Sequence, residues 1–332
     1  MPCAVDSRNK GKGVRPDPAL KHESSVNIRV FRFCLAGLVC AFILAAYSPY
    51  AWAKCDSPVA LQILGSGGPF GVGRASSGYI VWIDGVSRIM VDAGGGTFAQ
   101  FHKADAQVSD VRLFAVSHFH PDHSSEIPAL LWPEASTAHM AGPSGNDGYP
   151  SLDEFLDGLF GAPDAVFRVL GQRLNLSTTT VNVLAGQSVE VFSDEQIRVR
   201  GIGVPHGDVP TVGYRVDVGD ASVGFSSDQN GTNPAYTALV RGVDLLIVHF
   251  AASETPVGRT AALHARPSVW GQMASDVQAG GVVLSHLSES KPGHSRHGSH
   301  SGSDLDGSVA HFRSRYDGPL MIAEDLMCIA IE

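Results

Sequence analysis

A short histidine-rich segment carries the strongest chemical signal in this chain of 332 residues. Residues 117–124 read Ser-His-Phe-His-Pro-Asp-His-Ser, with three imidazoles and one carboxylate. His118 and His120 stand two positions apart, so in an extended segment their side chains share a face and can bind one ion. Asp122 and His123 follow where the chain turns, which aims them at a second position nearby. These donors suit zinc, and with different tuning iron or manganese.

Four donors cannot complete two metal sites, so this hypothesis predicts further histidine and aspartate ligands downstream. Three candidates, His206, Asp228 and His286, each end an apolar run. Residues at such boundaries between a strand and a loop often carry function. The predicted metal ligands are therefore His118, His120, Asp122, His123, His206, Asp228 and His286.

Short apolar runs separated by turn signals predict the strands that position these donors. The predicted strands span 59–65, 78–83, 87–92, 111–117, 189–192, 197–204, 212–218, 221–226 and 320–331. The predicted helices span 97–103, 124–132, 151–160 and 305–316. Two blocks of strands, each followed by helices, favour two packed sheets over one open sheet. The insert 133–186 is expected to cover the metal site and to set substrate choice.

The N-terminus has the layout of a secretory signal peptide. Two arginines precede an apolar stretch at 33–47, and small residues follow up to Ala53. About 15 apolar residues fall short of the roughly 20 that a spanning helix needs, although an uncleaved anchor stays open. We expect residues 1–53 to be a leader cleaved after Ala53, 54–332 to be a hydrolase domain, and the protein to be periplasmic or secreted. Translation starting near Val26 is an alternative.

The formal charge of the chain after cleavage of the leader limits which partners it can bind. The leader holds seven of the 24 basic and three of the 33 acidic residues, which leaves 17 basic and 30 acidic residues and a formal charge of about −13. Such a surface repels polyanions. We therefore expect a small-molecule substrate, with no nucleic acid and no stable membrane association after cleavage. The oligomeric state stays open, a homodimer included.

Cysteine usage leaves two alternatives. Once the leader is removed, Cys55 and Cys328 remain near opposite ends of the domain. They could form a disulfide in an oxidising compartment or stay as two thiols, because pairing depends on geometry.

Together these motifs resemble the metallo-β-lactamase superfamily, in the branch that contains ribonuclease Z and the zinc-dependent arylsulfatases. The resemblance covers nearly all of residues 59–332. Besides the histidine motif it rests on Leu64-Gly-Ser-Gly-Gly-Pro69, Val91-Asp-Ala-Gly94, Gly142-Pro-Ser-Gly145, Pro205-His206, Phe225-Ser-Ser-Asp228, Leu284-Ser-His286 and Ala323-Glu-Asp325. It implies an α/β fold, a four-layer αββα sandwich of two mixed sheets flanked by helices.

The resemblance also implies how two zinc ions are shared, with iron or manganese as alternatives. One ion is assigned to His118, His120 and His206, the other to Asp122, His123 and His286, and Asp228 bridges them. Asp92 would support the histidine loop from behind. Asp122 and His264 are the predicted catalytic residues, and His264 would donate a proton to the leaving group.

Two histidine-bearing stretches stay outside the predicted ligand set. His249 sits where related enzymes also have a histidine, usually before Glu or Asp, but here Phe250 follows it. The acidic contact is therefore missing or supplied differently. The loop 294–300 contains three histidines and favours a solvated loop over a metal scavenger.

The resemblance predicts an exported hydrolase of small sulfate esters, phosphodiesters or carboxylic esters, lactones included. A hydroxide shared by two metals would attack the ester. Ribonuclease Z carries a tRNA-gripping arm between the ligands matching His206 and Asp228, and only 22 positions separate them here. This short interval argues against tRNA. An iron-dependent redox enzyme and a non-catalytic metal- or ligand-binding protein are the alternatives.

Overall fold

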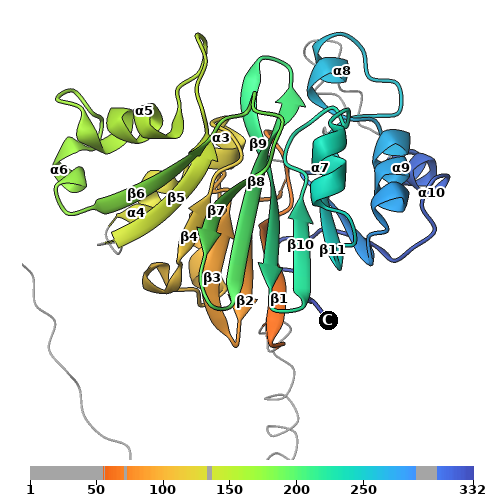
Figure 1. Ribbon diagram of the computed structural model, residues 1–332, viewed down its shortest axis with the longest axis horizontal. Helices are drawn as coiled ribbons and strands as arrows, with labels where there is room; N and C mark the ends of the chain where they lie inside the picture. The colour runs from red at the N-terminus through yellow and green to blue at the C-terminus, as the bar shows by residue number, and fades with distance from the viewer. Residues whose placement is uncertain (1–54, 56, 71–72, 133–136, 289–304) are drawn as a thin grey trace, which may run out of the picture. The chain divides into compact units, whose positions relative to one another are not determined.

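Two seven-stranded β-sheets pack against each other through an apolar interior (Figure 1). The computed structural model describes residues 55, 57–70, 73–132, 137–288 and 305–332, all within a unit that spans Trp52–Glu332. The predicted leader, its cleavage site and the 294–300 loop lie outside the described residues. In the described ranges, no helix combines the length and apolar content needed to cross a membrane.

The first sheet has the strand order β14-β1-β2-β3-β4-β5-β6. Its strands are β1 Val59–Gly65, β2 Gly78–Ile83, β3 Val86–Val91, β4 Leu113–Ala115, β5 Thr137–Pro143, β6 Asn175–Val181 and β14 Cys328–Ala330. The pairs from β14 to β3 are antiparallel, whereas β3, β4, β5 and β6 run parallel. This sheet is therefore mixed, as predicted.

The second sheet has the strand order β13-β12-β11-β10-β9-β8-β7. Its strands are β7 Val189–Ser193, β8 Ile197–His206, β9 Val209–Val218, β10 Ala221–Phe225, β11 Leu245–His249, β12 Gly281–Ser285 and β13 Leu320–Ile322. Strands β7 to β10 pair antiparallel, and β10 to β13 pair parallel. Parallel strands bring their carboxyl ends to one edge of the sheet. Asp228 follows the carboxyl end of β10, and His286 follows that of β12.

Helices cover the outer faces of both sheets (Figure 1). Those of the first half are α2 Thr97–Lys103, α3 Pro121–Ser124, α4 Ile127–Leu131, α5 Leu152–Leu156 and α6 Arg168–Gly171, with single turns η2 Val108–Asp110 and η3 Asp157–Gly161. Those of the second half are α7 Pro234–Leu239, α8 Arg259–Leu263, α9 Pro267–Val277 and α10 Leu305–Arg313. The four-layer αββα sandwich is confirmed.

The interior follows from the two-residue period of a strand. Alternate side chains such as Val81, Tyr214 and Val216 enter the layer between the sheets, where all are fully buried. Their neighbours face the helices: Ile80 packs in the cluster with Phe101 of α2, and Leu246 packs with Trp270 of α9. Three apolar layers thus hold the strand ends in fixed positions.

Two predicted elements are wrong in their extent, and two strands were not predicted. The helix predicted at 124–132 is two short helices, α3 and α4, because the chain bends at Glu126 before Pro128. The strand predicted at 320–331 is β13 and β14 in different sheets, with Leu326 in the left-handed region at φ 64° between them. Strands β5 and β6 were not predicted, since 137–143 contains glycine and proline and 175–181 is polar.

Candidate metal centre

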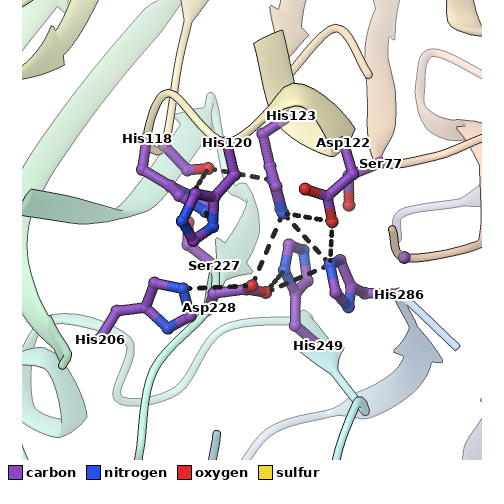
Figure 2. Close-up of polar contacts among 12 residues, drawn as sticks. Ser77, His118, His120, Asp122, His123, His206, Ser227, Asp228, His249 and His286 are labelled. Carbon is purple, nitrogen blue, oxygen red and sulfur yellow. Dashed lines mark hydrogen bonds and ion pairs between the residues drawn. The ribbon is translucent and has the colours of Figure 1, made fainter. Parts of the chain in front are cut away.

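The seven predicted ligands come together where strands of both sheets end (Figure 2). The loop after β4 carries His118 and His120, and α3 carries Asp122 and His123. From the second sheet, β8 ends at His206, while Asp228 and His286 follow β10 and β12. The structure therefore brings together donors that lie up to 168 positions apart in the sequence.

One group of donors consists of His118, His120 and His206, with ligand atoms all within 4.8 Å of one another. His118 Nε2 and His120 Nδ1 are 3.0 Å apart. Two nitrogens that share one tetrahedral ion at 2.0–2.1 Å lie about 3.3 Å apart, so this spacing fits a shared ion. These are the three residues that the resemblance assigns to the first ion.

A second group surrounds Asp228 and includes His123 and His286. His286 Nε2 lies 3.2 Å from His123 Nε2 and 3.2 Å from Asp122 Oδ2. Asp228 reaches both groups, because its Oδ2 lies 3.7 Å from His123 Nε2 and 3.6 Å from His206 Nε2. This carboxylate therefore lies between the two groups of donors.

Hydrogen bonds on the outer side fix the tautomers of two rings. Asp92 accepts from His123 Nδ1 at 2.8 Å and from the backbone N–H and hydroxyl of Ser117 at 2.7 and 2.9 Å. The carbonyl oxygen of Leu263 accepts from His206 Nδ1 at 2.8 Å. Both rings therefore direct Nε2 inward, and His206 Nε2 is buried without a hydrogen-bond partner among the described residues. A buried acceptor of this kind fits a metal.

Burial and charge perturb the ionisation of the cluster. Burial lowers the pKa of His118 well below its usual value. For His123 burial acts the same way, but Asp122, Asp92 and Asp228 outweigh it and hold its pKa well above the usual value. A divalent metal ion bound by this cluster would displace the proton of His123, because only deprotonated donors bind metal.

The backbone is strained at three positions beside the cluster. Asp92, Ser227 and His286 have φ of 57°, 54° and 53°, in the left-handed region. That conformation costs about 1–2 kcal/mol per residue. Gly94 has a related constraint, since a Cβ there would lie 2.0 Å from the backbone oxygen of Asp122. The chain thus turns sharply at His286, directly before Asp228 and at Asp92 behind the histidine loop.

The predicted proton donor, His264, lies at the edge of the cluster. Its Nδ1 is 3.9 Å from Asp228 Oδ2, and its side chain is 16% exposed, more than those of His206 and His286. Burial lowers its pKa to about 4. The ring thus combines contact with the central carboxylate and access to solvent.

His249 lies closer to the centre than the sequence indicated. Its Nδ1 is 2.9 Å from Asp228 Oδ1, and its Nε2 is 3.2 Å from the hydroxyl of Tyr79. All three side chains are buried. Because both ring nitrogens have partners, His249 holds Asp228 in place, and Phe250 beside it packs in the core with Phe312. The sequence signal for this role was that related enzymes also have a histidine at this place, but spacing alone does not reveal that its partner is Asp228.

A second supporting residue missed in the sequence is Asp325. It accepts from the backbone N–H and hydroxyl of Ser66 at 3.0 and 2.7 Å and from the backbone N–H of Ala75 at 2.7 Å. The two terminal motifs of the resemblance therefore contact each other. Gly68 in that loop lies against His286, since a Cβ there would be 2.8 Å from the ring.

Comparison with known proteins agrees with this geometry. Residues 87–287 match the family described as "Beta-lactamase superfamily domain". With the fold and the histidine motif, this match shows that the chain belongs to the metallo-β-lactamase superfamily.

One relative in sequence is ribonuclease Z of Synechococcus sp. (strain WH7803), 33% identical over 162 residues, which are 46% of this chain and 47% of the relative. The chain thus spans about half the length of the curated relatives it matches. Among solved structures, the metallo-β-lactamase fold protein YhfI of Bacillus subtilis has a TM-score of 0.64 at 17% identity, covering 82% of this chain and 99% of that chain. Human tRNase Z, short form, has a TM-score of 0.60 at 18% identity, with the same coverage.

These similarities contradict the expectation of a small-molecule substrate with no nucleic acid. The curated relative in sequence reported above and others like it are ribonucleases by name. The expectation relied on net charge, which sums over the whole surface and does not describe the field at one cleft. It also relied on the short interval between His206 and Asp228, which indeed holds only β9 and β10. A missing arm removes one contact surface and leaves the reacting site unchanged.

Proposed function

We propose that this chain is a two-metal, zinc-dependent hydrolase of phosphodiester bonds. The observation that carries the proposal is the position of Asp228, whose Oδ2 lies 3.6 Å from a donor of one histidine group and 3.7 Å from a donor of the other. A single carboxylate between two sets of imidazoles is the arrangement that holds two ions close together.

The residues divide into two ligand sets. His118, His120 and His206 would hold one ion, and His123, His286 and Asp122 the other. When bound, the ions would lower the pKa of a water and stabilise negative charge on the phosphoryl oxygens. Asp92 and Leu263 keep the Nε2 atoms of His123 and His206 directed inward.

His264 would complete the reaction. The water would release a proton to solvent as its oxygen bonds to phosphorus. The bond to the leaving oxygen would break, that oxygen would take a proton from the ring, and the ring would regain one from solvent. A phosphate anion beside the ring favours its protonated form. Asp122, the other predicted catalytic residue, shares the buried centre and contacts His286 at 3.2 Å.

The names of the relatives support a phosphodiester among the predicted ester classes. The linkage that a ribonuclease cleaves is a phosphodiester, and this bond is common to RNA and to small diesters. The proposal therefore concerns the reacting bond, and both kinds of substrate belong in its test.

We also propose export, which the disulfide supports. Cys55 and Cys328 are bonded, 273 positions apart, so the first of the two alternatives holds in the structure. Disulfides persist in oxidising compartments. A fusion of residues 1–53 to a reporter should direct it out of the cytoplasm, whereas cytoplasmic retention would contradict export.

The proposed function is tested with bis(4-nitrophenyl) phosphate and a structured RNA. We expect the zinc-loaded protein to hydrolyse at least one of them, to lose this activity in EDTA and to regain it with zinc. His118→Ala should abolish it, whereas His102→Ala, at an exposed histidine of α2, should not. Absence of hydrolysis with both substrates, or hydrolysis that persists in EDTA, would overturn the proposal.

A further inference from the structure

A cavity of about 380 Å³ opens next to His264. Besides that ring, the polar groups on its wall include Asn230, Thr232, Glu254 and Arg266. Since Nδ1 of His264 also lies 3.9 Å from Asp228, the cavity borders the proposed reacting centre on the side of the leaving group.

The carboxylate in this wall is already engaged. Glu254 Oε2 accepts from the backbone N–H of Ser268 at 3.0 Å, and Oε1 accepts from its hydroxyl at 2.5 Å. Ser268 lies in the first turn of α9, so Glu254 occupies the N-terminal end of that helix. The helix end is therefore not the anion site, and both carboxylate oxygens point to Ser268.

Two donors in the wall have no such partner. The exposed guanidinium of Arg266 makes no hydrogen bond or ion pair with any residue the structure describes, although its charge acts on Glu254 from a longer distance. Asn230 Oδ1 accepts from the backbone N–H and hydroxyl of Thr232 at 3.2 and 2.7 Å, which fixes the amide orientation. Its Nδ2 is thus a donor, and within the described ranges it too lacks a partner.

The backbone around these donors is anchored to the cluster. Ala265 stands between His264 and Arg266 in the sequence, and Gln229 directly follows Asp228. The N–H of Ala265 donates to the carbonyl of Gln229 at 2.8 Å. The N–H of Asn230 donates to the carbonyl of Pro205 at 2.9 Å, next to His206. The cavity is therefore held in a fixed position relative to the proposed ligands.

From these contacts we propose that the cavity binds a second phosphate group of the substrate, on the leaving-group side of the scissile bond. The inference rests on the proposed function and adds Arg266 and Asn230 as specificity-determining residues. In a chain with a formal net charge of −9, an unpaired guanidinium beside an amide donor is a local exception. Planar guanidinium donors match phosphate oxygens well.

The second phosphate could be a terminal group on a small diester or the next linkage of a polynucleotide. We would compare dithymidine phosphate with its 5′-phosphorylated and 3′-phosphorylated forms, and with a trinucleotide. One phosphorylated dinucleotide should exceed the plain one in kcat/KM by on the order of tenfold. A tenfold gain in kcat/KM that appears only with the trinucleotide would instead assign the cavity to the next linkage of a polynucleotide. Either gain supports the inference.

Arg266→Gln should remove the gain in kcat/KM of the phosphorylated substrate by raising its KM. Hydrolysis of bis(4-nitrophenyl) phosphate should stay near the wild-type rate. Arg266→Lys should restore part of the gain, and Arg259→Gln, at an exposed arginine of α8, is the matched control. Equal rates for all dinucleotides, or an equal loss on every substrate in Arg266→Gln, would overturn the inference while hydrolysis itself upholds the proposed function.

A binding measurement covers the case in which no substrate is turned over. Calorimetry with thymidine 3′,5′-bisphosphate and the zinc-loaded protein should show about tenfold weaker binding in Arg266→Gln, with thymidine 5′-monophosphate unaffected. Identical affinities of wild type and Arg266→Gln for the bisphosphate would overturn the inference on their own.

Discussion

His206 donates a hydrogen bond from Nδ1 to the carbonyl oxygen of Leu263, 2.8 Å away, and Leu263 directly precedes His264. The same bond that orients a proposed metal ligand therefore also fixes the backbone of the proposed proton donor. On the other side of His264, the N–H of Ala265 binds the carbonyl of Gln229. The backbone that carries the His264 ring is therefore held at both neighbouring residues, which reduces the entropy lost when the ring is positioned for reaction.

Replacement of His264 by alanine separates metal binding from proton transfer. Because the ring lies 3.9 Å from Asp228 and outside both ligand sets, the variant should retain its metals and lose about 10²–10⁴-fold in kcat. The loss should be smallest for substrates with a good leaving group such as 4-nitrophenolate, which needs no proton. Unchanged turnover of a dinucleotide would remove His264 from the mechanism.

Asp92 should matter for metal affinity. Its carboxylate fixes the tautomer of His123, so Asp92→Asn should weaken zinc binding by about 10–100-fold in competition with a chromogenic chelator. Asp84→Asn, at an exposed aspartate in the turn between β2 and β3, is the control. Equal zinc affinity of the Asp92 variant and the wild type would contradict the supporting role.

The disulfide should add to stability. Cys55 and Cys328 connect the chain just before β1 to β14, its partner strand, and close a loop of 273 positions. Reduction should lower the free energy of unfolding by about 2–4 kcal/mol. Urea titrations with and without reductant measure this change, and a Cys55→Ser/Cys328→Ser variant should not respond to reductant. Two reactive thiols in the denatured, unreduced protein would show that the bond does not form.

The contribution of Glu254 to the stability of the fold should depend on pH, and the direction of its pKa shift fixes the sign of this dependence. Burial acts to raise its pKa, but the hydrogen bonds from Ser268 and the charges of His311 and Arg266 lower it overall. A lowered pKa means that the stabilisation is present above the unfolded-state value near 4.5 and is lost as the pH falls through the folded-state value.

The corresponding measurement compares wild type with Glu254→Gln. At pH 7 the variant should be less stable, by less than about 1 kcal/mol because the carboxylate is partly solvated. The difference in urea midpoint should shrink toward pH 3.5. A difference that grows as the pH falls would contradict the assigned direction.

Local patterns in the sequence were sufficient for much of the fold. Alternating or continuous apolar runs located β1, β2 and β3 closely, since each buries a face. Strand β6 could not be found this way, because it is a half-exposed edge strand with a run of serine and threonine. The division of 320–331 between two sheets depends on pairing with β1 and β12, which no local pattern contains.

The candidate site shows the same division. Candidate metal donors at strand ends could be located because an apolar run precedes them in the sequence, as β12 precedes His286. The role of His249 could not, since it depends on contacts with Asp228 and Tyr79, 21 and 170 positions away. Substrate choice was predicted wrongly from net charge, whereas the unpaired donors of a single cavity become visible only in three dimensions.

The central claim is that Asp228 joins two metal sites. Metal analysis of the purified protein by mass spectrometry, after dialysis against metal-free buffer, tests it most directly. We expect two zinc ions per chain in the wild type and a loss of at least one ion in Asp228→Ala. One ion or fewer per wild-type chain, or two ions retained by Asp228→Ala, would contradict it.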